Sequence, residues 1–163
     1  MRTKSISFPN SLSEMEDLFD KLQRAETNRL LNSGGLAIKA GSSAVVKTVN
    51  TVKVLVDGVL VSKAAADMAA LVGTVAHDAF NVWVFTVNAA GTLASHQGTA
   101  GATLAEVVFP EITDGQVCLG FVIINPTGTG TFTGGSSALD GATTPNAVYI
   151  DTPFSFLPEL AEL

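Results

Sequence analysis

A change of hydrophobic period near residue 35 constrains the fold of this chain more than any other feature of its sequence. Before that point, apolar residues recur at intervals of three and four, the spacing of one face of an α-helix. After Gly35, short runs of β-branched and aromatic residues alternate with Gly, Pro, Asn and Asp, the pattern of strands and turns. We therefore expect an arm and an amphipathic helix over residues 1–35, followed by a β body over residues 36–163.

The helix is expected to run from Ser11 to Leu31. Ser13 followed by Glu16 fits a capping box, and Ser11 with Glu14 is the alternative start. The apolar residues form one stripe, which must be covered by the body, by a sister helix or by another protein. We take five members of this stripe as candidate partner-binding residues, with Leu30 continuing the same spacing: Leu12, Met15, Leu18, Phe19 and Leu22.

The body is predicted to contain roughly eight to ten short strands, which is typical of an antiparallel β-sandwich or a jelly-roll-like barrel. Asp57-Gly58, between two β-branched runs, predicts a tight hairpin. The longest apolar strand, Gln116 to Asn125, is expected to be central. Ala64 to Val72 is compatible with a short helix or a loop, and Ala105 to Phe109 with a short strand. The chain is thus expected to be mainly β with an N-terminal helix.

Charge is scarce and unevenly distributed. Charged residues make up 15% of the chain, which has a net charge of −6, and every Lys and Arg lies at or before Lys63. A stretch of a hundred residues without a fixed positive charge is unsuited to phosphate, so we expect no nucleic-acid binding by the body. No apolar run reaches about 18 residues, and the N-terminus does not resemble a signal peptide. We therefore expect no membrane contact and synthesis in the cytoplasm.

Residues suited to catalysis or metal binding are few and isolated. His77 and His96 are expected in or near turns, and the side chains of His77 and Asp78 are expected to point apart. Cys118 lies in an apolar strand and is expected to be a buried thiol, while Trp83 is expected in the core. We expect no catalytic residue, no cofactor and no metal ion, and therefore a protein that is not an enzyme.

Several stretches between Leu36 and Phe154 carry a resemblance to a known class of proteins. They are Val-Lys-Val-Leu-Val-Asp-Gly-Val-Leu-Val, Trp-Val-Phe-Thr-Val-Asn-Ala-Ala-Gly-Thr, Pro-Glu-Ile-Thr-Asp-Gly-Gln-Val-Cys-Leu-Gly-Phe-Val-Ile-Ile-Asn, Thr-Phe-Thr-Gly-Gly and Val-Tyr-Ile-Asp. In their residue pattern and in their order along the chain, they resemble the small virion structural proteins of tailed bacteriophages, of the capsid decoration or cement type. The resemblance implies a β-sandwich, symmetric copies on the capsid surface, and binding across subunits of the major capsid protein.

The resemblance does not include the helix, so the role of the helix must come from its own chemistry. We expect residues 1–35 to provide most of the attachment to the particle, and the body to fold without them. The low charged share, the helix stripe and the apolar run Phe154–Leu160 favour a homo-oligomer, with a trimer preferred. Two alternatives remain: a tail or fibre component with an adhesin-like, glycan-binding β domain, and an enzyme or carbohydrate-binding module.

Overall fold

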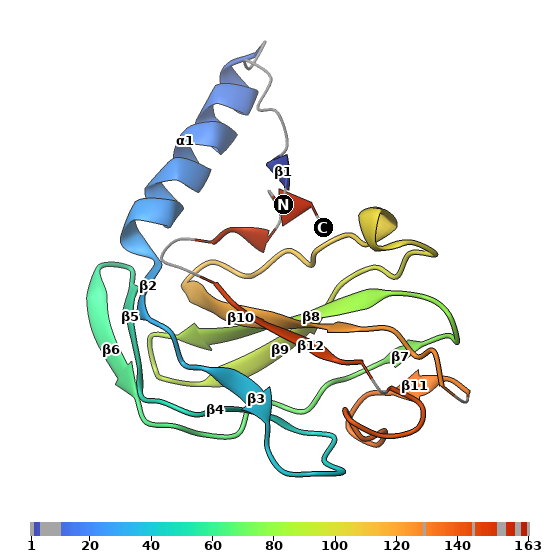
Figure 1. Ribbon diagram of the computed structural model, residues 1–163. Helices are drawn as coiled ribbons and strands as arrows, with labels where there is room; N and C mark the ends of the chain where they lie inside the picture. The colour runs from blue at the N-terminus through green and yellow to red at the C-terminus, as the bar shows by residue number, and fades with distance from the viewer. Residues whose placement is uncertain are drawn as a thin grey trace.

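The computed structural model shows a β-sandwich-like body with one N-terminal helix projecting from it (Figure 1). The structure describes residues 2–3, 11–128, 130–144, 146–152, 156–158 and 161–162. All strand pairs among these residues are antiparallel. The expected fold class, mainly β and antiparallel with a helix at the N-terminus, is confirmed.

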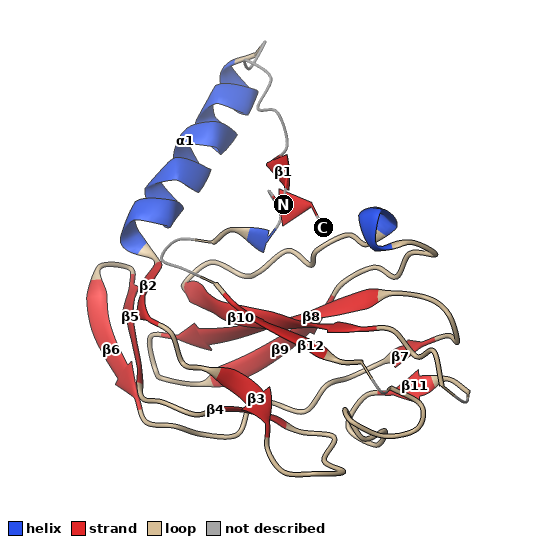
Figure 2. Ribbon diagram, in the orientation of Figure 1, coloured by secondary structure: helices blue, strands red, loops and turns tan. Residues whose placement is uncertain are grey.

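Figure 2 shows how the elements divide between the body and the projection. The main sheet has the order β12 (Val148–Asp151), β10 (Gln116–Ile124), β8 (Asn81–Asn88) and β9 (Leu93–Gln97). A three-stranded sheet has the order β2 (Arg29–Asn32), β5 (Val52–Val56) and β6 (Val59–Lys63). Three two-stranded pairs complete the strands: β3 (Leu36–Ile38) with β4 (Val46–Thr48), β7 (Thr74–Val75) with β11 (Phe132–Thr133), and β1 (Arg2–Thr3) with β13 (Ala161–Glu162). The helices are α1 (Leu12–Thr27) and the 3₁₀ turn η1 (Leu104–Glu106).

The core explains why β8 and β10 are nearly continuous apolar runs. On one face of the main sheet, Trp83 and Phe85 pack into a cluster with Val54 of the three-stranded sheet. On the other face, Val84 and Phe121 belong to a second cluster, which the connection between β9 and β10 covers with Val107, Phe109 and Ile112. Both faces of the central strands are therefore buried. Neither strand needs the alternation of apolar and polar residues that is typical of a sheet with one face in water. Trp83 is fully buried and Cys118 nearly so, as expected.

The hairpin predicted at Asp57-Gly58 is confirmed. Val56 pairs with Val59, so the two residues between them form the whole turn. Both turn residues have positive φ angles, +50° at Asp57 and +76° at Gly58, as the tight turn preferred in antiparallel hairpins requires. The expectation that the strand beginning at Gln116 is central is also confirmed, because β10 pairs with β8 on one side and with β12 on the other.

The structure corrects two local expectations and decides between the two alternatives for a third stretch. The expected helix does not reach Leu31, because α1 ends at Thr27 and residues 29–32 form β2, which pairs with β5. Leu30, expected on the helix stripe, is 1% exposed in the body core, so β2 belongs to the body and not to the arm. Residues 64–72 form a loop, which is one of the two alternatives expected there, and η1 with an isolated bridge takes the place of the strand expected at Ala105–Phe109.

Gly120 provides a sharp test of packing in the central sheet. It lies in β10 beside a shift in register with β8 and has a φ angle of +151°. A Cβ atom there would overlap the Ile150 carbonyl oxygen and the side chain of Leu36. We expect Gly120→Ala to lower the free energy of unfolding by about 3 kcal/mol, since overpacking and backbone strain add together.

The matched control for that variant is Gly58→Ala. Gly58 also has a positive φ angle, but a Cβ atom there would meet nothing within 4 Å. It should therefore show the backbone strain alone, about 1 kcal/mol. Urea unfolding of both variants provides the measurement. Equal losses in the two variants would contradict the close packing that we assign to Gly120.

Candidate functional site

The candidate site is α1, a helix that begins well away from the body. Ser11 is its N-cap: the Ser11 hydroxyl accepts a hydrogen bond from the Glu14 backbone N–H at 3.2 Å. In return, the Glu14 carboxylate accepts the Ser11 backbone N–H at 3.2 Å. This reciprocal pair is a complete capping box, and it selects Ser11–Glu14 over Ser13–Glu16 as the helix start. The N-terminal end of α1 therefore has its own means of starting the helix.

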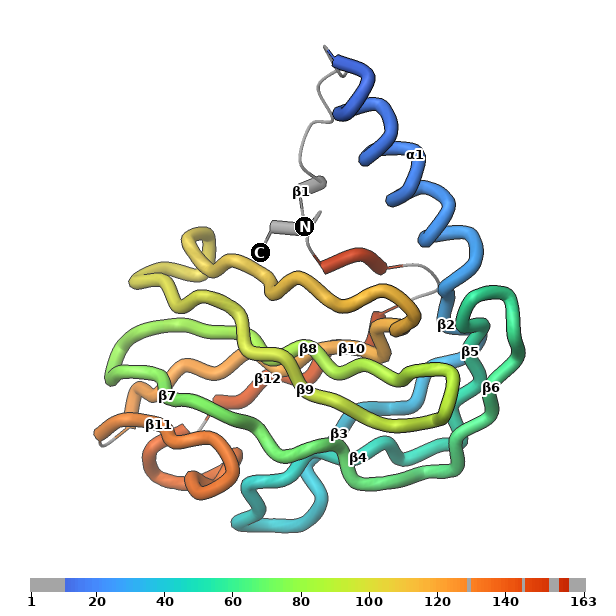
Figure 3. Tube along the Cα trace, turned by 180° about the vertical axis from the view of Figure 1, so that it is seen from behind, coloured from blue at the N-terminus to red at the C-terminus, as the bar shows by residue number. Residues whose placement is uncertain are grey.

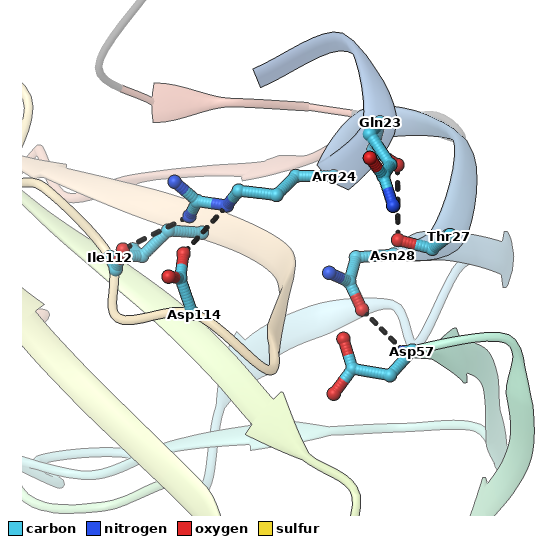
Figure 4. A network of polar contacts seen from close by, with 7 residues as sticks. All are labelled: Gln23, Arg24, Thr27, Asn28, Asp57, Ile112 and Asp114. Carbon is cyan, nitrogen blue, oxygen red and sulfur yellow. Dashed lines mark hydrogen bonds and ion pairs between the residues drawn. The ribbon is translucent and has the colours of Figure 1, made fainter. Parts of the chain in front are cut away.

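The C-terminal end of α1 is joined to the β5–β6 hairpin (Figure 4). The Asn28 side-chain oxygen accepts the backbone N–H of Asp57 at 2.7 Å. The Thr27 carbonyl accepts the backbone N–H of Gly58 at 3.0 Å. Because the hairpin turn donates to the last residues of the helix, the direction in which α1 leaves the body is fixed at this end.

Arg24 makes a second connection at the same end of the helix. Its Nε atom lies 2.9 Å from a carboxylate oxygen of Asp114, and its guanidinium donates to the Ile112 carbonyl at 3.2 Å (Figure 4). Together the hairpin and the 112–115 turn form what we call the helix joint. The joint surrounds a polar pocket lined by Asp20, Gln23, Arg24, Thr27, Asn28, Asp57, Asp114 and Gly115.

Large apolar side chains are exposed along α1. The exposed fractions are 76% for Leu12, 40% for Met15, 64% for Phe19 and 52% for Leu22. None of the residues of α1 is buried. We call these four residues the exposed stripe. Leu18, the fifth residue expected on the stripe, is half-buried and lies beside it.

The exposed stripe and the helix joint lie on different sides of α1. Each residue turns the helix by about 100°, so Leu22 and Arg24 point about 160° apart. Since Arg24 faces the body, the stripe near the base of the helix faces away from it. Both views of the backbone show α1 extending beyond the sandwich (Figures 1 and 3). The body therefore leaves the stripe available to another surface.

The two histidines were placed only partly correctly by sequence. His77 lies in a turn, as expected, but its Nδ1 atom is 2.9 Å from the Asp78 carboxylate, so the expectation that these side chains point apart is wrong. Turn geometry brings neighbouring side chains together where a strand would separate them. His96 lies within β9 and not beside a turn; its Nε2 atom is 3.0 Å from both Thr86 Oγ1 and Gln116 Oε1.

Tyr149 is a described residue whose pKa is shifted by its surroundings. Burial, and then the nearby Asp140 carboxylate, raise the pKa of Tyr149 to about 12, so this phenol stays protonated across the physiological range. Over the described ranges, no group of three or more His, Cys, Asp or Glu residues is arranged to hold a metal ion. The described helices include none long and apolar enough to cross a membrane.

Sequence reasoning found the exposed stripe but missed the helix joint. Four of the five candidate residues lie along one exposed face of α1, because the three- and four-residue spacing is a local property of a helix. The joint brings Arg24 to Ile112, which lies 88 residues further along the chain. No spacing in the sequence signals such a contact. The nearest signal was the Asp57-Gly58 turn, whose partner the sequence did not reveal.

Comparison with protein-family models, with curated proteins and with solved structures finds no match to this chain. The geometry of the helix, its joint and the body must therefore support any proposal about function.

Rigidity at the helix joint can be tested with Arg24→Met. We expect a loss of less than about 1 kcal/mol in the free energy of unfolding, because the Asp114 side chain is 82% exposed and such ion pairs contribute little. The orientation of α1 should be much more affected, since the tie between the helix and the 112–115 turn is lost.

The measurement is the distance distribution between spin labels introduced by Ser13→Cys on α1 and Ser62→Cys on β6. Arg24→Met should broaden this distribution. The control is Lys21→Met, which removes the ion pair of Lys21 with Asp17 inside the helix and leaves the joint intact. A distribution equally narrow in both variants would show that Arg24 does not orient the helix.

Proposed function

We propose that this chain is a non-enzymatic structural protein of a virus particle, a capsid decoration protein that binds the major capsid protein and stabilises the shell. The exposed stripe carries this proposal, because its four large apolar side chains stand 40–76% exposed on a helix whose C-terminal end is tied to the body. Monomeric proteins rarely leave such contiguous apolar surface in water unless another surface covers it.

The β body also supports a structural role for this chain. Its central strands are buried on both faces, which gives a rigid support for the projecting helix. The sequence stretches between Leu36 and Phe154 resemble those of decoration proteins of tailed bacteriophages, which implies many copies on the capsid surface. A rigid body with one adhesive projection is suited to attachment. It requires no cavity for a substrate.

The test is the amount and position of the chain in purified particles. A decoration protein should be present in numbers comparable with the shell subunit and should appear on the outer capsid surface in a low-resolution map of the particle. A few copies located at the tail would favour the alternative, a tail or fibre component, and a glycan array would then test binding to host sugars. Absence of the chain from purified particles would overturn the proposal.

We also propose that the chain forms a homo-oligomer, with a trimer favoured. Besides the low charged share, β6 supports association, because it is an outer strand of its sheet and both Val59 and Leu60 are 61% exposed. Identical chains usually close into symmetric rings. Light scattering of the isolated protein should give three times the mass of one chain. A stable monomer at micromolar concentration would count against the trimer.

A further inference from the structure

The helix carries a row of unpaired acids beside the exposed stripe. Glu16 lies on one flank of the stripe, and Glu26 lies four residues beyond Leu22, where the stripe ends. Asp20, four residues after Glu16, lies closer to the helix joint, whose pocket it lines. Among the residues that the structure describes, none of these three carboxylates has a basic partner. The other two acids of α1 are engaged, since Glu14 caps the helix and Asp17 pairs with Lys21.

This row is unfavourable for α1 by itself. Like charges four residues apart on a helix repel each other, so Glu16 and Asp20 weaken the helix that carries the stripe. The helix has two basic residues, but Lys21 bonds Asp17 and Arg24 bonds Asp114. Within the described part of the chain, the two basic residues of α1 are thus engaged with other acids. A surface that covers the stripe can supply the complementary charge.

The charges argue against a second copy as that surface. Leu12, Met15, Phe19 and Leu22 follow the seven-residue repeat of helix bundles, and Glu26 falls on the next core position. In a parallel bundle of α1 helices, the Glu26 carboxylates would face one another. Any second copy also brings the same row of acids, and α1 has five acidic and two basic residues. Helices that lie on membrane surfaces have basic polar faces, so a lipid surface is a poor match as well.

We propose that α1 docks into an apolar groove on a different protein chain, and that the rim of this groove carries Lys or Arg. The exposed stripe fills the groove, in the manner of an amphipathic helix anchored at successive turns. Glu16 faces a basic residue on one rim, and Glu26 faces one at the end of the groove. This inference rests on the proposed role of the stripe as an interface, and it specifies the chemistry of the partner.

Photocrosslinking identifies the occupant. The probe is the full chain with a photoreactive benzoyl-phenylalanine in place of Phe19, made in the host during particle assembly. The control carries the same group at Ser13, which points about 140° away from the centre of the stripe. We expect the Phe19 probe, and not the Ser13 probe, to give an adduct with another chain, at a peptide of apolar residues with Lys or Arg nearby.

Charge reversal then tests the basic rim. Glu16→Lys turns the repulsive pair with Asp20 into an attractive one, so helix content should hold or rise. The yield of the Phe19 adduct should nevertheless fall about fivefold, and it should fall further at high salt. Glu111→Lys is the matched control, because it makes the same charge change at an exposed acid of the body and should leave the yield unchanged.

The outcomes separate this inference from the proposed function. A charge-sensitive adduct with a capsid chain supports both, and one with a chain absent from the particle supports the groove but overturns the capsid role. An adduct with another copy of this chain overturns the inference and leaves the capsid role standing. So does the lack of any adduct at Phe19, or an adduct whose yield is the same in Glu16→Lys and Glu111→Lys.

Discussion

Replacing Phe19 and Leu22 together by Ala should weaken attachment to the particle about a hundredfold and leave the free energy of unfolding nearly unchanged. Both side chains are more than half exposed in the free protein, so the body loses little packing when they are removed. In a docked helix they are central anchors, and truncating such anchors costs about 2 kcal/mol or more each. Alanine also favours the helix, so α1 should remain folded.

Rebinding of the purified variant to particles stripped of the native protein gives the affinity, and urea unfolding gives the stability. Val49→Ala with Val72→Ala is the matched control, because these body residues are 54% and 72% exposed and lie outside α1. The control should bind like the native chain. Equal losses in the two double variants would show that general surface hydrophobicity, and not the exposed stripe, drives attachment.

A shortened chain that begins at Asn28 should fold, whereas one that begins at Leu36 should not. The first keeps β2 and the Asn28 hydrogen bond to the β5–β6 turn. The second loses Leu30, which is 1% exposed in the core, together with the pairing of β2 to β5. Removing one buried leucine side chain alone costs about 2–5 kcal/mol, which approaches the whole stability of a typical domain.

Circular dichroism and urea unfolding distinguish the two shortened chains, and rebinding to stripped particles completes the test. The chain beginning at Asn28 should be folded and should not bind, because it lacks α1. A folded chain beginning at Leu36, with an unchanged unfolding midpoint, would contradict the assignment of β2 to the core. Full binding by the chain beginning at Asn28 would move the attachment site to the body.

The features predicted correctly from sequence are those determined by neighbouring residues. The Asp57-Gly58 turn fixes its own hairpin, and the stripe on α1 follows from helical spacing. The boundary of the helix could not be predicted in this way. Arg29, Leu30 and Leu31 have good helix propensity and Leu30 continues the helical spacing, yet pairing with β5 overrides this preference. The residues around a strand do not indicate that it will pair with another strand more than twenty residues away.

The segment that covers the second face of the main sheet could not be predicted from the sequence either. Its cover comes from a connection without regular hydrophobic period, which carries Val107, Phe109 and Ile112. The candidate site was predictable to the same extent: the exposed residues of α1 were recognised, whereas its orientation depends on contacts of Arg24 and Asn28 with distant turns. His96 was misplaced because its partners lie on two other strands.

The cover over this second face has a consequence for synthesis of the chain on the ribosome. Phe156 lies against both Phe109 and Phe121, with ring centroids 5.7 Å and 5.8 Å away. Phe156 is added 35 residues after Phe121, so the nascent chain lacks this part of the aromatic cover until residue 156 has been made. Incomplete chains with exposed apolar surface are prone to aggregate. Translation products that end before Phe156 should therefore depend on chaperones to stay in solution, whereas chains that include Phe156 cover this part of the core themselves.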